Sequence, residues 1–597
     1  MLPDKISAAF DNKKFRIAFL SLIILVQIIY GTYVFAFEKM GFYTDEVWSY
    51  SYSNYFSDVF VYARDGYMGN FHDNGIVSEY IAVQPGERFN FSGVYKNSSG
   101  DLNPPLYYML LHFICSFFPD KWSVVPAYII NVLSVIGTQI FLYLICRDIF
   151  REKKYLPFVC CIYYAVSRGA LDTLIFLRMY AMLTFFTVMH IRYQFRVLHS
   201  SDIKETKKSI LLSFISCYAG FMTQSFFPAV GGIMTFMVCL RLAFGKQFKK
   251  MFAHGFSMLG AVLLYAVTFP PGVLHVISSG SSAHTEGSEF PFVTQFRSMI
   301  NFVLLPLTGR NISVFNTYTW IYVSVFLPVA AVLIGAAAFL LRKDPKFIKF
   351  RAAAAEKTKA FIRGKKYLGV ISYEFAALAA VAAGYLAVAA KVINIMLMGL
   401  FAERYVMNLF PLFCIGVCMV AYRLFAAVRP LKKAAVPAAA CAAAVLGMIS
   451  QTNHSGFLID DLGKHDDLAA LFSGKKVEFV IGKPWESICF YPYLTECGSF
   501  RFIGYEDISA DPEVIQCTGG DDGELYVAVP LSHYDISANV PNGTGSGSPN
   551  AVDGALPSEP DRALETFCGD GSVKSIEHIC DFSAFVGPKT LYKITFD

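Results

Sequence analysis

Two adjacent carboxylates follow the first long apolar run of the chain. Asp45 and Glu46 lie in the segment GFYTDEVWSY, a few residues after the run ends near Phe37. Carboxylates this close to a membrane-spanning segment are costly to desolvate unless they have partners. One interpretation is structural, because acidic residues stabilise the first turn of a helix. The other is catalytic: a general base beside a substrate held at the membrane surface.

A second polar segment begins with a double proline. It reads NPPLYYMLLH and carries Asn103, Tyr108 and His112 among apolar residues. Proline is tolerated in the first turn of a helix because its missing N–H has no partner there in any case. The segment therefore predicts a helix start. Whether its polar side chains bind a substrate or only form an amphipathic face stays open at this point.

Two arginines lie near the ends of other apolar runs. Arg178 is in LRMYAMLTFF. An arginine there is costly and is expected to be functional, to pair with Asp172 or to reach toward the interface. Arg404 and Tyr405 follow Glu403 at the start of a later run. The planar guanidinium group matches two phosphate oxygens, so Arg404 is a candidate phosphate ligand, its alternative being an interfacial anchor.

The composition places these residues in a polytopic membrane protein. Of 597 residues, 55% are apolar and only 16% are charged, and mean hydropathy is +0.45. About 25% charged residues is usual for soluble proteins. A net charge of +5 is too small and too unevenly placed for nucleic-acid binding, so we expect no nucleic-acid partner.

The apolar runs predict about eleven membrane spans. The first, Phe15 to Phe37, is too long for a signal peptide and is interpreted as a retained anchor. The inner segments defined by a cytoplasmic N-terminus hold more than half of the 51 lysines and arginines. The positive-inside rule requires such a distribution. The other expected spans are 122–146, 155–171, 173–193, 209–222, 226–243, 252–270, 318–341, 368–391, 404–425 and 433–450.

Two shorter runs are interpreted differently. Residues 104–118 are too few to span, and counting them would place the basic segment 147–154 outside, so we expect an interfacial helix on the outer leaflet. Residues 299–309 are expected to be similar or re-entrant. The resulting domains are a transmembrane domain over 1–450, in which 38–121 is the first outer loop, and an extracytoplasmic domain over 451–597.

Residues 451–597 form a different kind of sequence. They hold half of the 46 acidic residues and show strand-like runs at Val477–Ile481, Leu525–Val529 and Leu591–Phe596. A helix is expected over Asp466–Phe472 and a flexible loop over Asn539–Pro560. Five of the 14 cysteines fall here without a Cys-x-x-Cys motif. A metal site is therefore not expected, and a small mixed α/β domain is the prediction.

Taken together and in this order, the motifs resemble a known family. The acidic pair after the first span, then PPLYYMLLH, RMYAMLTFF and RY followed by Pro411, look like the GT-C glycosyltransferases that use polyprenyl-phosphate sugars. The protein-mannosyltransferase and aminoarabinose-transferase branch is the most similar. The resemblance covers about residues 15–425, and the Asp-Glu pair with PPLYY is its most specific part.

The resemblance implies an enzyme of the cell envelope that moves a sugar from a lipid-linked phosphate at the outer leaflet, with inversion. Asp45 matches the catalytic carboxylate, and Glu46 would position Asp45 or the acceptor. Arg404 and then Arg178 would stabilise the leaving phosphate. The relatives usually carry His or Lys where this chain has Asn103, which cannot neutralise a phosphate.

The resemblance also implies contacts around the substrate. Tyr108, His112 and Tyr405 are further candidate binding residues. No cofactor is implied, and the absence of an Asp-x-Asp beside the pair gives no support to a divalent cation.

Three alternatives stay open. One is an O-antigen polymerase or ligase, which would use a lipid-diphosphate donor. Another is a lipid or sugar transporter, although the two matching halves common in transporters are not evident. The third is a non-catalytic scaffold. The sugar, and whether the acceptor is a protein, a lipid or a glycan, are left undetermined; compact cytoplasmic loops favour a bacterial cell membrane over the endoplasmic reticulum.

Overall fold

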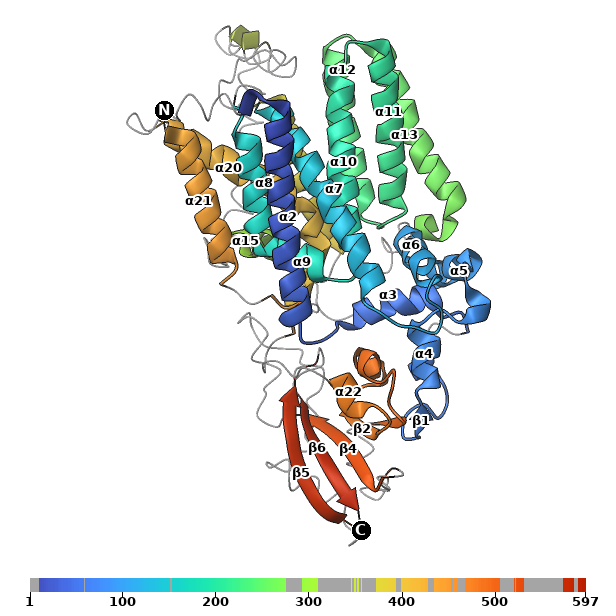
Figure 1. Ribbon diagram of the computed structural model, residues 1–597. Helices are drawn as coiled ribbons and strands as arrows, with labels where there is room; N and C mark the ends of the chain where they lie inside the picture. Colours follow the sequence, from blue (N-terminus) through green and yellow to red (C-terminus); the bar gives the residue numbers. More distant parts are fainter. Residues whose placement is uncertain are drawn as a thin grey trace.

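The computed structural model (Figure 1) describes most of the chain. The described residues are 10–57, 60–101, 103–150, 153–274, 292–309, 372–392, 399–427, 434–452, 455–459, 468–504, 522–530, 573–582 and 589–596, with single or paired positions at 345, 348–349, 352–353, 356, 520 and 584. The expected span 318–341 and the expected loop 539–560 lie outside them.

Long helices make up the bulk of the described residues. Six are long and apolar enough to cross a membrane, or seven if one bent pair counts as a single span. These are α2 (Lys13–Phe37), α7 (Val125–Ile149), α12 (Phe227–Phe244), α13 (Phe248–Thr268), α18 (Tyr373–Val392) and η4 with α20 (Gly399–Leu409, Phe410–Ala427), the pair being α8 (Leu156–Val166) and α9 (Arg168–Ile175).

Other helices coincide with expected spans without meeting that test. They are α10 (Tyr180–His199), α11 (Ile203–Phe221) and α21 (Ala435–Ser450), and α15 (Phe292–Thr308) occupies the run expected near 299–309. A multi-pass membrane protein is therefore what the described helices support. The full count of eleven stays a prediction.

One division of the chain differs from expectation. Instead of spans over 155–171 and 173–193, α8 and α9 meet at a bend of 60°, and α10 begins only at Tyr180. Ser167 adopts an extended backbone at the bend, and its side chain accepts a hydrogen bond from the Ala170 N–H as the N-cap of α9. A side-chain cap starts a new helix where hydropathy alone shows one continuous run.

The segment 38–121, expected to be the first outer loop and called the first outer segment below, folds into short helices below the bundle (Figure 1). They are α3 (Thr44–Asn54), η1 (Val61–Ala63), α4 (Gly75–Ile81), η2 (Pro85–Glu87), α5 (Phe91–Asp101) and α6 (Leu106–Cys115). The helix α6 has 10 residues. It is therefore about half as long as a membrane span. The interfacial helix expected at 104–118 thus corresponds to α6.

Five strands from the C-terminal region and one from the first outer segment form a six-stranded mixed sheet in the described part of the chain. Its order is β1-β3-β2-β4-β6-β5, with β2 parallel to β3 and β4 and the other pairs antiparallel. The strands are β1 (His72–Asp73), β2 (Lys476–Ile481), β3 (Ser499–Gly504), β4 (Glu524–Pro530), β5 (Val573–Phe582) and β6 (Lys589–Phe596), and the short helices are α22 (Leu468–Phe472) and η6 (Pro484–Tyr493).

The sheet is joined to the first outer segment. Its edge strand β1 comes from that segment, where His72 pairs with Phe500. The Tyr67 hydroxyl lies 2.9 Å from Ser487 Oγ, and the Tyr493 hydroxyl donates to the Met40 carbonyl oxygen at 3.0 Å. The sheet is therefore in direct contact with the loop that carries the acidic pair, and the domain boundary at residue 450 stays a prediction.

A buried lysine in β6 makes the stability of the sheet depend on pH. Lys589 donates to the Val480 carbonyl oxygen at 3.0 Å, and burial lowers its pKa from 10.5 to about 8. Between these values the unfolded chain binds a proton that the folded protein does not, so stability rises with pH through this window. The difference is worth about 3 kcal/mol at about 1.4 kcal/mol per pKa unit.

We expect Lys589→Met to remove this dependence. Thermal unfolding between pH 7.5 and 10 should show a melting temperature that rises with pH in the wild type and rises less in the variant. Lys593→Met is the matched control, since Lys593 is on the same strand, but its side chain is 24% exposed and paired with Glu524. Equal pH profiles in wild type and Lys589→Met would contradict the assignment.

Candidate active site

The acidic pair lies in the first turn of α3, where the two carboxylates have different tasks. Tyr43 is the N-cap, with an extended backbone, and Glu46 stands three residues into the helix. The Glu46 carboxylate accepts the Tyr43 N–H at 2.8 Å. This is the return bond of a capping box, which fixes where a helix begins. Glu46 is therefore the residue that starts α3.

Glu46 also ties together three segments that are far apart in the sequence. Lys39 Nζ, beyond the end of α2, lies 2.8 and 2.9 Å from its two carboxylate oxygens. The Leu177 N–H, between α9 and α10, donates to Oε1 at 2.8 Å. Lys39 in turn donates to the Phe457 carbonyl oxygen at 3.1 Å. Glu46 is only 1% exposed and its oxygens are fully engaged, which suits a positioning residue.

Asp45 is held differently, between two arginines. Arg404 Nη1 lies 3.2 Å from Asp45 Oδ2, and Arg178 Nη1 donates to the Asp45 backbone carbonyl oxygen at 2.6 Å. Oδ1 has no hydrogen-bond partner in the described part of the chain, and the side chain is 10% exposed. One oxygen of the carboxylate is thus anchored while the other is available.

Aromatic rings hold the Arg404 guanidinium in place. Its central carbon lies 5.2 Å from the Tyr43 ring centre and 5.0 Å from that of Tyr405. Nη1 also donates to the Tyr43 hydroxyl at 2.7 Å. Burial raises the pKa of Tyr43 to about 12, so this phenol is neutral near pH 7. The rings fix the plane of the guanidinium without neutralising it.

Both arginines keep a buried donor without an acceptor. Among the described residues, Nε of Arg178 and Nε of Arg404 are buried and have no hydrogen-bond partner. Buried donors of charged groups are rarely left unpaired, because each costs about 1–3 kcal/mol or more. An anionic ligand rich in oxygen atoms would accept hydrogen bonds from both of these donors, next to the Asp45 carboxylate.

A second buried ion cluster includes the residue that precedes Arg404. Arg168 lies 3.1 Å from Asp172 Oδ2 and 2.7 Å from Oε2 of Glu403, the residue before Arg404. The pairing of Arg178 with Asp172 that the sequence left open is therefore not formed. Asp172 pairs with Arg168, one turn earlier on the same helix, and Arg178 turns toward α3.

We expect Arg168→Met to lower stability by about 3–5 kcal/mol, because it leaves the buried carboxylates of Asp172 and Glu403 without a cation. Thermal unfolding of the purified protein measures the loss. The triple variant Arg168→Met, Asp172→Asn, Glu403→Gln removes all three charges and should recover part of it. A loss below about 1 kcal/mol in the single variant would contradict this role.

Other predicted site residues lie elsewhere along α3. The His112 ring faces Asn54 Oδ1, with Nδ1 at 3.3 Å. At about 1.5 Å per residue, this end of α3 is about 14 Å from Asp45. Tyr108 packs on Tyr52, with ring centres 5.5 Å apart. Asn103 is half-buried before α6.

Tyr405 is a further candidate that lies at the site. Its ring packs against the Arg404 guanidinium, as described above. The structure therefore brings Asp45, Glu46, Arg178, Arg404 and Tyr405 together, with Tyr108 near Arg178. His112 lies outside this group, at the far end of α3.

Three residues of the arrangement were not among the predicted ones. Lys39 and Tyr43 flank the acidic pair in sequence, and a glutamate three residues after the N-cap was a readable signal of the capping box. Arg168 gave no local signal, because its partner Glu403 is 235 residues away. In the described residues, no group of three or more His, Cys, Asp or Glu side chains is arranged to hold a metal ion.

Comparisons with known proteins found similar solved structures. ArnT from Cupriavidus metallidurans bound to undecaprenyl phosphate is 8% identical, covering 96% of this chain and 98% of that one, with a TM-score of 0.39. Its apo state is 9% identical, covering 96% and 97%, with a TM-score of 0.41. The Archaeoglobus fulgidus oligosaccharyltransferase tethered with an acceptor peptide is 10% identical, covering 87% and 69%, with a TM-score of 0.36.

No family model and no curated protein matches the chain. Transferases of the kind that the sequence motifs resemble are thus among the solved structures to which this chain is similar. At these identities and TM-scores, what the chain does is argued from its own residues.

Proposed function

We propose that this protein is an inverting glycosyltransferase that takes its sugar from a polyprenyl-phosphate donor. The observation that carries the proposal is the position of Asp45. One oxygen of its carboxylate pairs with Arg404, and the other has no hydrogen-bond partner among the described residues. Two buried arginine Nε–H groups near it also lack acceptors there. A base next to a phosphate-binding pair of guanidinium groups is what transfer from a phosphate-linked sugar requires.

The reaction needs a base and a stabilised leaving group. Asp45 Oδ1 would accept the proton of the acceptor hydroxyl while the hydroxyl oxygen of the acceptor forms a bond to the anomeric carbon of the sugar. The bond from that carbon to the phosphate oxygen breaks on the opposite face, so the configuration inverts. The bond electrons leave with the lipid phosphate, whose added negative charge Arg404 and Arg178 would stabilise.

Arg404 has two roles in this scheme. Its Nη1 lies 3.2 Å from Asp45 Oδ2, and its Nε–H, which has no acceptor among the described residues, would meet a phosphate oxygen. Arg178 is held by the Asp45 backbone carbonyl oxygen, so it approaches the site without competing for the carboxylate. Glu46, Lys39 and the cap of α3 would position Asp45 and take no part in bond making.

The expected topology supports an outer-leaflet reaction. The basic segments of the chain place the N-terminus in the cytoplasm and the acidic pair outside. Tyr493 and the other contacts of η6 bring the C-terminal sheet beside the same segment. We infer that the sheet covers the outer side of the site and takes part in accepting the second substrate.

Binding of undecaprenyl phosphate tests the proposal directly. Mass spectrometry of lipid extracted from the purified full-length protein should detect a polyprenyl monophosphate. In a separate titration, undecaprenyl phosphate should bind to the wild type and more weakly to the double variant Arg178→Gln, Arg404→Gln. A polyprenyl diphosphate as the bound lipid would instead favour a polymerase or ligase. Transport of lipid in vesicles without any modified acceptor would favour a transporter.

A further inference from the structure

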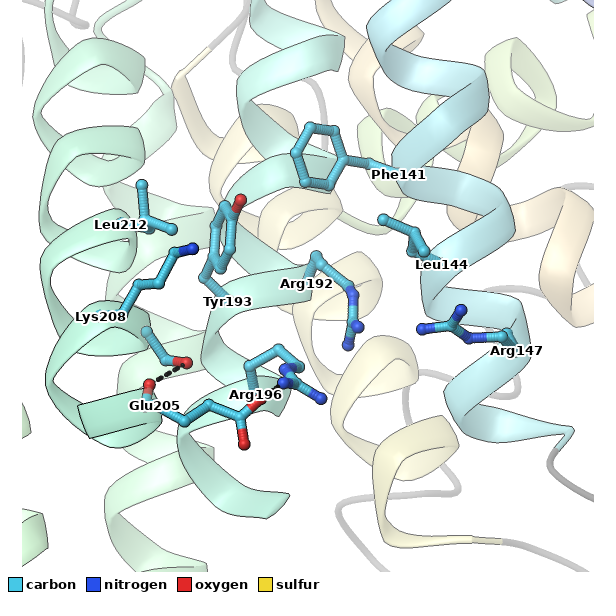
Figure 2. Close-up of a pocket in the computed structure, with 10 residues that line it drawn as sticks. Phe141, Leu144, Arg147, Arg192, Tyr193, Arg196, Glu205, Lys208 and Leu212 are labelled. Carbon is cyan, nitrogen blue, oxygen red and sulfur yellow. Dashed lines mark hydrogen bonds and ion pairs between the residues drawn. The ribbon is translucent and has the colours of Figure 1, made fainter. Parts of the chain in front are cut away.

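A basic cavity lies at the other end of the helical bundle from Asp45. It has a volume of about 300 Å³ and opens between α7, α10 and α11 (Figure 2). Four cationic side chains line it: Arg147 of α7, Arg192 and Arg196 of α10, and Lys208 of α11. Such a concentration of positive charge in one hollow attracts an anion.

Its depth in the bundle can be estimated along α7. Asn131 donates to the Phe176 carbonyl oxygen at 2.7 Å, close to the Asp45 site, whereas Arg147 is in the last turn of the same helix. At about 1.5 Å per residue, Asn131 and Arg147 are separated by about 24 Å. The hydrocarbon core of a bilayer is about 30 Å thick. The cavity therefore lies near the opposite membrane interface and is distinct from the proposed active site.

The charges in the cavity are not balanced by protein carboxylates. Arg192 pairs with Asp148, and Arg196 pairs with Glu205. Within the described ranges, Arg147 and Lys208 have no carboxylate partner. Two positive charges are thus in excess, and Arg192 is only 5% exposed, so part of this charge is withdrawn from water.

Three apolar residues also line the cavity, on the side toward the middle of the bilayer, and Tyr193, Glu205 and Ser209 complete the lining. Phe141 and Leu144 come before Arg147 on α7, and Leu212 comes one turn after Lys208 on α11, which runs in the opposite direction. Figure 2 shows the guanidinium ends of Arg147 and Arg192 extending into the space between α7 and α10. The cations are therefore at the interface and the apolar side chains beneath them.

We propose that this cavity binds the phosphate of an anionic phospholipid from the leaflet opposite the Asp45 site. A phosphate oxygen pair matches the arginine groups, and the first carbons of the acyl chains would lie against Phe141, Leu144 and Leu212. A soluble phosphate offers the same anion but leaves the apolar wall exposed to water. From the interface toward the middle of the bilayer, the cavity presents cations first and apolar side chains next, as a phospholipid presents its phosphate and then its acyl chains.

Native mass spectrometry of the full-length protein in detergent tests the site, with dioleoyl phosphatidylglycerol and dioleoyl phosphatidylcholine as probes. We expect Arg147→Gln, Lys208→Gln to weaken phosphatidylglycerol binding about 25-fold, since each basic residue is worth about fivefold at an anionic surface. Both side chains are exposed, so we expect the fold to be kept.

The matched control is Lys204→Gln, Lys207→Gln, which removes the same amount of charge, here from α11 alone, at two positions that do not line the cavity. It should change binding by less than about threefold. Equal loss in both double variants, or equal binding of phosphatidylcholine by wild type, would overturn the proposal. Displacement of phosphatidylglycerol by millimolar inorganic phosphate would reassign the cavity to a soluble phosphate.

Discussion

Replacement of Asp45 by Asn is expected to abolish sugar transfer while donor binding is kept. The amide has nearly the same shape but cannot accept the acceptor proton, and a general base contributes about 10²–10⁴-fold. The Asp45 carboxylate also forms an ion pair with Arg404. Because its removal frees Arg404 to bind phosphate, the affinity for undecaprenyl phosphate should be unchanged or higher. Transfer is measured as polyprenyl monophosphate released in single-turnover reactions, and binding in a separate titration.

A second variant guards against loss of the fold. Asn at this position leaves Arg404 buried without its carboxylate, whereas Asp45→Glu keeps the charge and displaces it by one methylene. A displacement of about 1 Å in a reacting group costs up to about 10²-fold in rate. Asp65→Asn, an exposed carboxylate in the same outer segment, is the matched control and should retain wild-type transfer. Full transfer by Asp45→Asn would refute the base assignment.

The family resemblance implied separate roles for the acidic pair, with Asp45 as the base and Glu46 as a positioning residue, but the local sequence did not say which of them caps the helix. Both a helix cap and a base were consistent with Asp45-Glu46, and the structure assigns the cap to Glu46 through its bonds to Tyr43, Leu177 and Lys39. A glutamate in the third position of the helix is a local signal. The Leu177 N–H and Lys39 are contacts made by packing, which hydropathy and motif order do not encode.

The arginines illustrate the same limit over longer distances. Arg178 was predicted from the cost of burying charge and Arg404 from the match of its guanidinium group to phosphate oxygens. The structure brings both to Asp45. The support for Arg404 through Arg168 was not predictable, because Arg168 and Glu403 meet only when α9 packs against η4. His112 shares the polar segment that suggested a binding role, yet it packs at the far end of α3, beside Asn54.

Strand positions in the C-terminal region were readable because each core strand is a short apolar run. The expected Val477–Ile481, Leu525–Val529 and Leu591–Phe596 coincide with β2, β4 and β6. The two-residue strand β1 was not predicted, since it is too short for any periodicity. It is nevertheless the element that pairs the first outer segment with the sheet at Phe500.

Arg404→Gln should reduce both transfer and donor binding, unlike Asp45→Asn. If Arg404 stabilises the departing phosphate, the charge it meets is larger in the transition state than in the bound donor, so the rate should fall more than the affinity. Removing one donor to a developing oxyanion costs about 10²–10³-fold in rate. The same single-turnover reactions and undecaprenyl phosphate titrations separate the two effects.

Arg404→Lys isolates the contribution of the guanidinium plane. Lysine keeps the positive charge but cannot bind two phosphate oxygens in one plane or lie flat between the Tyr43 and Tyr405 rings. We expect its transfer rate to fall between those of Gln and wild type, with donor affinity closer to wild type. Arg423→Gln, exposed at the opposite end of α20, is the matched control. Unchanged transfer in Arg404→Gln would refute its role and move the stabilisation of the leaving phosphate to Arg178, which contacts the Asp45 backbone from the other side of the pair.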